Sequence, residues 1–193
     1  MKRHTLLLSL LLASIGCAVS PDKAELQLAP VPPDVRAWSR QFGGCVRDDA
    51  RQQRALSALA RLRAAQDSRL AIYVLRTERV AAYAWSQGAV FVSCGLLDVM
   101  DDDELVAVVA HEMGHLLADG HMEHPSALAG ASALLDAESR ADQLGCLLLS
   151  ASDMDPSLML RMLRKLQAHV APSVRPHIRA RIQALNQTSP QPI

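Results

Sequence analysis

The longest apolar pattern in the chain covers residues 105–117 and predicts a buried central helix. Its sequence, LVAVVAHEMGHLL, carries apolar residues on nearly every helical face, which is typical of a helix inside a core. Asp101 and Glu104 precede this run at the spacing of a capping box, so we expect the helix to begin there.

Shorter patterns predict a small sheet before this helix and more helices after it. Residues 48–65 place leucines along one helical side. Three expected strands, at residues 70–75, 80–85 and 89–93, would form a three-stranded sheet, and later helices are expected at about residues 136–150, 156–168 and 177–185. Together these elements predict an α+β, mostly helical domain over residues 48–187, followed by a frayed end at residues 188–193.

The chain before this domain has a different character. Residues 1–16 combine a basic start with an apolar stretch too short to span a bilayer, which is typical of an export signal. Gly16-Cys17 resembles a bacterial lipobox, so we expect a lipoprotein-type signal peptide and a lipid on Cys17 that anchors the protein at the periplasmic face of the outer membrane. Cleavage after Ala18, which would leave a soluble periplasmic protein, is the alternative. Residues 17–47 are rich in proline and predict an extended tether.

The buried helix contains the motif HExxH, formed by His111, Glu112 and His115. Residues four apart share a helical face, so both imidazoles can bind one ion, while Glu112 is placed to act on a water without binding the metal. Two imidazoles and a carboxylate inside an apolar helix are unfavourable unless something compensates them, and a metal ion does so.

A second pair of residues, Glu138 and Asp142, completes the predicted site from the next helix. We expect Glu138 to be the third ligand beside His111 and His115, and Asp142 to hydrogen-bond the far ring nitrogen of a ligating histidine. Taken alone, the acidic pair would be read as a solvated helix face. Three protein ligands leave a fourth position for water, which predicts one catalytic Zn²⁺ per chain.

His121 offers a competing ligand, because metzincins place a third histidine six residues after the second one. That geometry needs a glycine three residues after the second histidine, where this chain has Ala118; the glycine is Gly120. We therefore prefer Glu138 to His121.

Taken together, these segments resemble the gluzincin metallopeptidases of the HtpX and CAAX prenyl protease type, and more narrowly their soluble members of the bacterial envelope. The resemblance covers about residues 48–185. It rests on GAVFVSCGLL at residues 88–97, DELVAVVAHEMGH at 103–115, and ESRAD at 138–142 with a later Asp155-Pro156. It implies a zincin-like domain and a zinc-dependent endopeptidase in which Glu112 is the general base.

The chain departs from this family in two places. The interval between His115 and Glu138 is shorter than usual. The family also carries a His-Pro pair six residues before an Arg-Ile pair, and that histidine is thought to steady the oxyanion. Counting back from Arg181-Ile182 gives Arg175-Pro176, so the resemblance implies Arg175 as oxyanion donor, with His177 as the alternative.

Composition narrows the possible partners. Lys plus Arg and Asp plus Glu number 20 each, with no basic stripe, which argues against nucleic acid. Six aromatic residues are too few for a stacking platform for glycans or bases, so polypeptides, in particular unfolded envelope proteins, are the expected substrates. The alternatives are an envelope chaperone or assembly factor that keeps the zinc site, and a zinc peptidase acting on peptidoglycan cross-links.

Three cysteines follow Cys17, namely Cys45, Cys94 and Cys146. In an oxidising compartment, one disulfide and one buried thiol are the simplest expectation. The sequence does not determine which two would pair.

Overall fold

The computed structural model describes residues 31–46, 49–66, 70–85, 87–119 and 131–188. The expected signal peptide, its Cys17, the first part of the expected tether and His121 lie outside these residues. The folded unit begins at Val31. None of the helices within the described ranges is long and apolar enough to cross a membrane.

The sheet has four strands in the order β1, β2, β4, β3. Their bounds are β1 Cys45–Val46, β2 Ala71–Leu75, β3 Ala82–Trp85 and β4 Ala89–Ser93. Strand β4 pairs in parallel with β2 and antiparallel with β3, and all five of its residues are buried. β4 is therefore an inner strand, and β3 forms one edge of the sheet.

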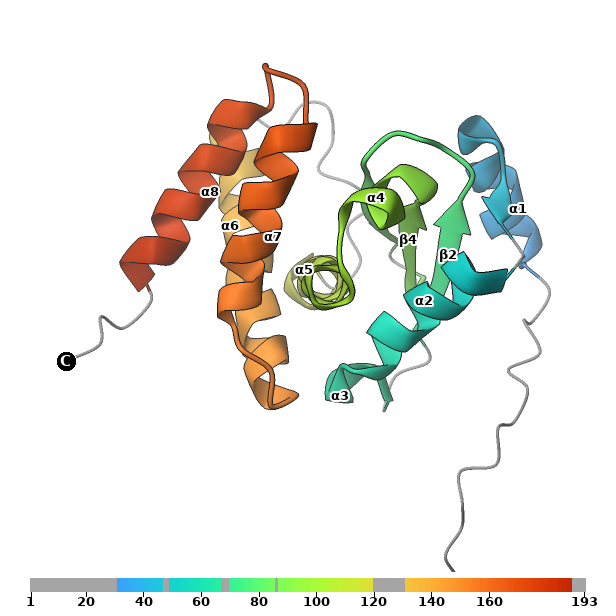
Figure 1. The fold of residues 1–193 in the computed structure, drawn as a ribbon, viewed down its shortest axis with the longest axis horizontal. Coiled ribbons are helices and arrows are strands. Elements are labelled where there is room, and N and C mark those ends of the chain that lie inside the picture. Colours follow the sequence, from blue (N-terminus) through green and yellow to red (C-terminus); the bar gives the residue numbers. More distant parts are fainter. Residues whose placement is uncertain (1–30, 47–48, 67–69, 86, 120–130, 189–193) are drawn as a thin grey trace, which may run out of the picture. The chain divides into compact units, whose positions relative to one another are not determined.

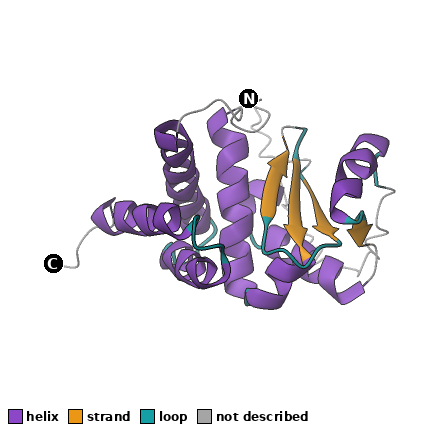
Figure 2. Ribbon diagram, turned by 90° about the horizontal axis from the view of Figure 1, so that it is seen from above, coloured by secondary structure: helices purple, strands orange, loops and turns teal. Residues whose placement is uncertain are grey.

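Helices cover both faces of this sheet (Figures 1 and 2). One face packs its aliphatic side chains against α2 (Asp49–Ala60) and α5 (Asp102–Asp119). The other face packs against α1 (Pro33–Ser39). That second face gathers every aromatic residue of the chain: Trp38, Phe42, Tyr73, Tyr83, Trp85 and Phe91. We call this group the aromatic cluster.

Helix α5 is the central element, and its start has a local cause. The backbone N–H of Glu104 donates to Asp101 Oδ1 at 2.9 Å, and the N–H of Asp101 donates to Glu104 Oε2 at 2.9 Å. This reciprocal pair is the predicted capping box, which satisfies two N–H groups that a helix start leaves unpaired.

The helices after α5 form the second part of the domain (Figure 1). They are α6 (Ala131–Ala151), α7 (Ser157–His169) and α8 (Arg175–Thr188), and α5 packs most extensively on α6. Gly114 lies against Ala141, and Gly145 lies against the backbone of His111, so α5 and α6 run antiparallel at close range.

Three expectations about the fold were wrong in detail. The sheet has four strands rather than three. The unpredicted strand is β1, whose two residues are too few to leave an alternating pattern in the sequence. Residues 33–46 form α1, the short 3₁₀ helix Arg40–Phe42 and β1 rather than an extended tether, since Pro33 suits the first turn of a helix and Val35 is buried against the sheet. The expected single helix at residues 48–65 is divided into α2 and α3 (Arg63–Gln66).

The expectation of a disulfide was also wrong. Cys45, Cys94 and Cys146 are free thiols that belong to β1, α4 (Cys94–Val99) and α6 respectively. Burial raises the pKa of Cys146 to about 11, and its Sγ contacts the carbonyl oxygen of Pro156 at 3.8 Å. It is therefore protonated at neutral pH.

Candidate metal centre

Two histidines of α5 and one glutamate of α6 point their ligand atoms at a common space. His111 Nε2 lies 3.4 Å from Glu138 Oε2, and His115 Nε2 lies 3.3 Å from Glu138 Oε1. One ligand atom from each of the three residues falls within 4.8 Å of the others.

These separations fit a tetrahedral metal site. With metal–ligand bonds of about 2.1 Å and tetrahedral angles of about 109°, neighbouring ligand atoms are expected about 3.4 Å apart. The two nitrogen–oxygen distances, 3.3 and 3.4 Å, are close to that spacing, and each histidine faces a different oxygen of the Glu138 carboxylate. The donor set of two imidazoles and a carboxylate is also one that zinc commonly takes.

The centre is open on one side. The His111 side chain is 8% exposed, whereas those of His115 and Glu138 are 19% and 37% exposed. A metal held here could be approached by a substrate from the His115 and Glu138 side, as expected of a catalytic rather than a structural site.

Helix packing brings Glu138 to the two histidines. A Cβ on Gly114 would lie 2.5 Å from the carbonyl oxygen of Ala141, and a Cβ on Gly145 would lie 3.2 Å from the backbone nitrogen of His111. Glycine at both positions therefore lets α5 and α6 approach closely. Glu138 is one helical turn from Ala141 and so falls beside His115.

Asp142 supports His111 from the far side of its ring. Its Oδ1 lies 2.9 Å from His111 Nδ1, and its side chain is 1% exposed. This contact leaves Nε2 as the nitrogen that faces Glu138 and fixes the ring orientation, as an outer carboxylate does in many zinc sites.

Glu112 lies next to the ligand His111 and is 7% exposed. Burial raises its pKa, while the nearby His111 and His115 act in the opposite direction. A carboxyl group with a raised pKa is better matched to accepting a proton near neutral pH than an ordinary glutamate.

Arg181 of α8 is the site residue that sequence reasoning missed. Its Nη1 lies 2.7 Å from Glu138 Oε2, its Nη2 lies 2.6 Å from Asp142 Oδ1, and its Nε donates to Asp142 Oδ2 at 2.8 Å. The residue is 5% exposed. The signal for it in the sequence is an arginine among the apolar positions Ile178, Ile182 and Leu185 of a predicted helix.

The protonation of the centre reflects these contacts. Burial and Arg181 disfavour a charge on His111, but hydrogen bonds to Asp142 and Glu138 outweigh them and raise its pKa to about 9. Despite burial, hydrogen bonds from His111 and His115 lower the pKa of Glu138, and those from Arg181 and His111 lower that of Asp142. A metal ligand must be deprotonated, so metal uptake would release a proton from His111.

Arg175 and His177 both lie exposed in the first turns of α8. The Arg175 Nε contacts the carbonyl oxygen of Val170 at 3.4 Å. Within the described part of the chain, no contact joins either side chain to His111, His115 or Glu138. The oxyanion role of Arg175, with His177 as alternative, stays a prediction.

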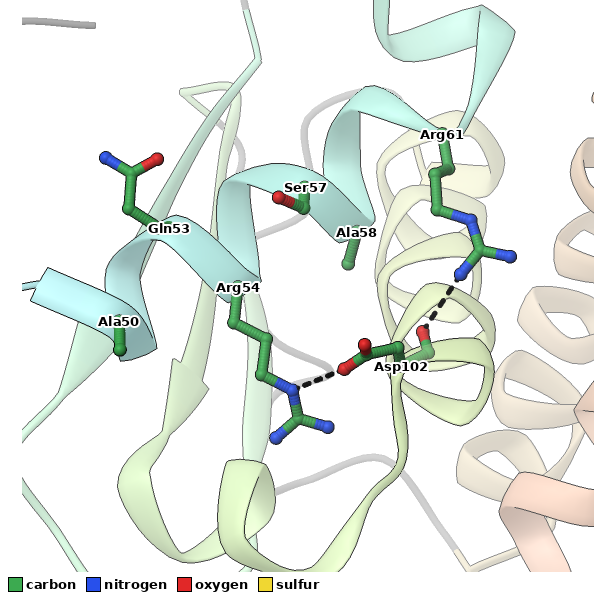
Figure 3. A pocket seen from close by; sticks show the side chains of 7 residues that line it. All are labelled: Ala50, Gln53, Arg54, Ser57, Ala58, Arg61 and Asp102. Carbon is green, nitrogen blue, oxygen red and sulfur yellow. Dashed lines mark hydrogen bonds and ion pairs between the residues drawn. The ribbon is translucent and has the colours of Figure 1, made fainter. Parts of the chain in front are cut away.

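A hollow with a volume of about 280 Å³ lies between α2 and the start of α5 (Figure 3). Asp102 on its wall precedes His111 by nine residues, or about 13 Å along the helix. The guanidinium of Arg54 contacts Asp102 and the carbonyl oxygens of Leu97 and Met100, and that of Arg61 contacts Asp103. The guanidinium groups of Arg54 and Arg61 are thus paired with oxygen atoms of the protein.

Comparison with known proteins gives two relevant matches. Residues 47–137 match the model of Peptidase family M48. Metalloprotease LoiP of Escherichia coli (strain K12) is 44% identical over 50 residues, which are 26% of this chain and 19% of the relative. The chain thus matches about a fifth of the length of this relative. The family match includes His111, Glu112 and His115 and ends one residue before Glu138, whose place in the site rests on the geometry.

Proposed function

Residues 47–137 match peptidase family M48, and on this premise we propose that the chain is a member of that family and a zinc-dependent endopeptidase of the bacterial envelope. Metalloproteases of this family depend on zinc, and the protein has a possible His-His-Glu metal site. The convergence of His111, His115 and Glu138 beside the buried Glu112 is the observation that carries the proposal.

His111, His115 and Glu138 would hold the ion. When bound, zinc lowers the pKa of a water molecule and polarises the scissile carbonyl group. Glu112 accepts the proton of the attacking water and delivers it to the leaving amine. Asp142 keeps the His111 ring in the tautomer that leaves Nε2 free for the ion.

An extended polypeptide can pair with the sheet edge beside α5. Strand β4 offers no free edge for such pairing, because it lies between β2 and β3. The edge strand is β3, and it packs against α5. A substrate added along β3 would be bound through its backbone, so unfolded proteins of varied sequence would be accepted.

The place of action is the envelope, with unfolded or misassembled envelope proteins as substrates. The expected export signal at residues 1–16 and the resemblance of Gly16-Cys17 to a lipobox support this. We expect mass spectrometry of the mature protein to find a lipidated Cys17 at the N-terminus; a mature chain that begins after Ala18 would instead indicate a soluble periplasmic protein.

The decisive experiment compares wild-type protein with Glu112→Gln on unfolded outer-membrane protein. Wild-type protein should create new termini that a chelator suppresses. Glu112→Gln should cut the rate by about 10²–10⁴-fold while zinc stays bound, because it removes the base and no ligand. Cleavage that survives in Glu112→Gln but is still lost on chelation would require another base. A parallel incubation with murein tests peptidoglycan cross-links as substrates.

An envelope chaperone or assembly factor that keeps zinc but cleaves poorly is the second candidate. It is favoured by Arg175, which replaces the family's histidine and lies exposed at the start of α8. Wild-type protein that binds zinc and prevents aggregation of unfolded outer-membrane protein, without new termini, would support this function over proteolysis.

A further inference from the structure

We propose that Arg181 is a positioning residue of the metal centre, which orients Glu138 and Asp142 from α8 and so couples the docking of α8 to zinc binding. The inference rests on the proposed zinc site. It goes beyond it by making the last helix of the domain part of the centre.

The first support is the shape of the contact. The Arg181 guanidinium makes a two-pronged contact with Asp142, through Nη2 at 2.6 Å and Nε at 2.8 Å, and uses Nη1 to reach Glu138 at 2.7 Å. A planar guanidinium presents donors in a fixed fork, so one group sets the relative orientation of both carboxylates. Asp142 contacts His111 Nδ1 at 2.9 Å and Arg181 Nη2 itself lies 3.3 Å from that nitrogen, so the same fork also fixes the His111 ring.

The second support is the charge at the centre. Glu112, Glu138 and Asp142 would bring three negative charges into a largely buried space. Arg181 offsets one of them and a zinc ion offsets the other two, with both histidines neutral. Removing a buried partner leaves an uncompensated charge, which is strongly unfavourable. The centre is therefore balanced only when α8 is docked and the metal is bound.

The third support is the place of Arg181 on its helix. Ile178, Arg181 and Leu185 are the buried residues of α8, at spacings of three and four that put them on one face. Apolar side chains at all three positions would dock α8 on α6 and α7 equally well. The charged group at the middle position instead pairs with the carboxylates of Glu138 and Asp142.

Zinc binding and α8 docking should then support each other. Occupying the metal site neutralises Glu138 further and keeps its carboxylate in the place that Arg181 recognises. By thermodynamic linkage, any change that weakens the packing of α8 lowers the affinity for zinc, and loss of zinc weakens the packing of α8.

The test compares Arg181→Met, Arg181→Lys and the control Arg179→Met. Arg179 is an exposed arginine on the same helix. Zinc affinity is measured by competition with a chromophoric chelator, folding of the metal-free protein by circular dichroism in urea, and α8 stability by amide hydrogen exchange with and without zinc. We expect zinc affinity to fall by about 10–100-fold in Arg181→Met and less in Arg181→Lys, which keeps the charge but loses the fork.

Hydrogen exchange separates a role in zinc binding from a role in folding alone, because only the first makes the exchange rates of the α8 amides depend on zinc. Zinc should slow exchange of the α8 amides in wild type and in Arg179→Met, but not in Arg181→Met. A folded Arg181→Met protein with zinc affinity within about twofold of wild type would overturn the proposal. If Arg181→Met does not fold, Arg181→Lys decides, and wild-type affinity in that variant would equally overturn it.

The outcome can be separated from that of the proposed function. Wild-type protein that binds zinc, shows the coupling and yet cleaves no polypeptide would refute the endopeptidase and leave the role of Arg181 intact. Cleavage by the wild-type protein, together with unchanged zinc affinity in Arg181→Met, would support the endopeptidase and refute the role of Arg181.

Discussion

Two clusters of carboxylates and basic side chains lie along helix α5, and they differ in their exposure to solvent. At its start, Asp101, Asp102, Asp103 and Glu104 face Arg54, Arg61, Arg161 and Lys165; we call this the N-terminal ionic cluster. Further along, Glu138 and Asp142 face Arg181 beside two histidines. The Arg161 and Asp101 side chains are 46% and 51% exposed, whereas those of Arg181 and Asp142 are 6% and 1% exposed.

The difference shows what makes a charged cluster a candidate site. Exposed ion pairs contribute little because water solvates each partner nearly as well. In the buried centre water cannot replace a missing partner, so each charged group relies on its neighbours to compensate its charge. The ligand atoms of this centre also lie close to one another. The N-terminal ionic cluster starts the helix, while the buried centre can bind a metal.

The largest expected effect is at the ligands. Glu138→Ala should remove the third ligand, so that stoichiometric zinc and proteolysis are both lost; His111→Ala and His115→Ala should behave alike. Metal content by atomic absorption after dialysis measures this. Stoichiometric zinc in Glu138→Ala would contradict the assignment and point to His121.

The next effect concerns the oxyanion. If Arg175 donates to it, Arg175→Ala should lower kcat by about 10²–10³-fold and leave zinc content unchanged. Steady-state cleavage of a fluorogenic peptide gives kcat, with His177→Ala as the matched variant. Near-normal kcat in Arg175→Ala together with a collapse in His177→Ala would transfer the role to His177.

A smaller effect is expected at Asp142, which touches His111 but not the common ligand space. Asp142→Asn should weaken zinc affinity or activity by about 10–100-fold while keeping the site, because a neutral amide oxygen accepts a weaker hydrogen bond from the His111 ring than a carboxylate does. Chelator competition measures this. Unaltered affinity and turnover would mean that Arg181 and Asp142 form only a structural pair.

The smallest effect is expected in the N-terminal ionic cluster. Arg61 and Asp103 are 41% and 47% exposed, so Arg61→Ala should lower the free energy of unfolding by less than about 1 kcal/mol and leave zinc affinity unchanged. Urea unfolding measures this. A loss of zinc in this variant would show that the two clusters are coupled along α5.

Features with a local cause could be predicted from the sequence. The capping box and the buried helix depend on neighbouring residues, and the structure confirms both. The α+β, mostly helical class is also confirmed, as is the resemblance to gluzincin metallopeptidases, through the match to peptidase family M48. Strand β3 was expected at residues 80–85 and is found at Ala82–Trp85.

Features that depend on contacts between residues far apart in the chain could not be predicted from the sequence. Arg181 lies 39 residues from Asp142 and 70 from His111 in the chain, so no periodicity links them. The position of β4 inside the sheet depends on the return of β3 along its outer side, which strand patterns do not specify. Strand β1 needs its partner Leu75 to exist at all, because two residues make no pattern.

The aromatic cluster determines which part of the molecule is monitored when unfolding is followed by intrinsic fluorescence. Both tryptophans, Trp38 and Trp85, stack at a centroid distance of 6.0 Å on the sheet face away from α5. Intrinsic emission therefore follows the contact between α1 and the sheet, whereas α6, α7 and α8 contain no tryptophan. Comparing an emission trace with a far-ultraviolet dichroism trace, to which every helix contributes, would show whether the aromatic side and the metal-binding side come apart in one step or in two.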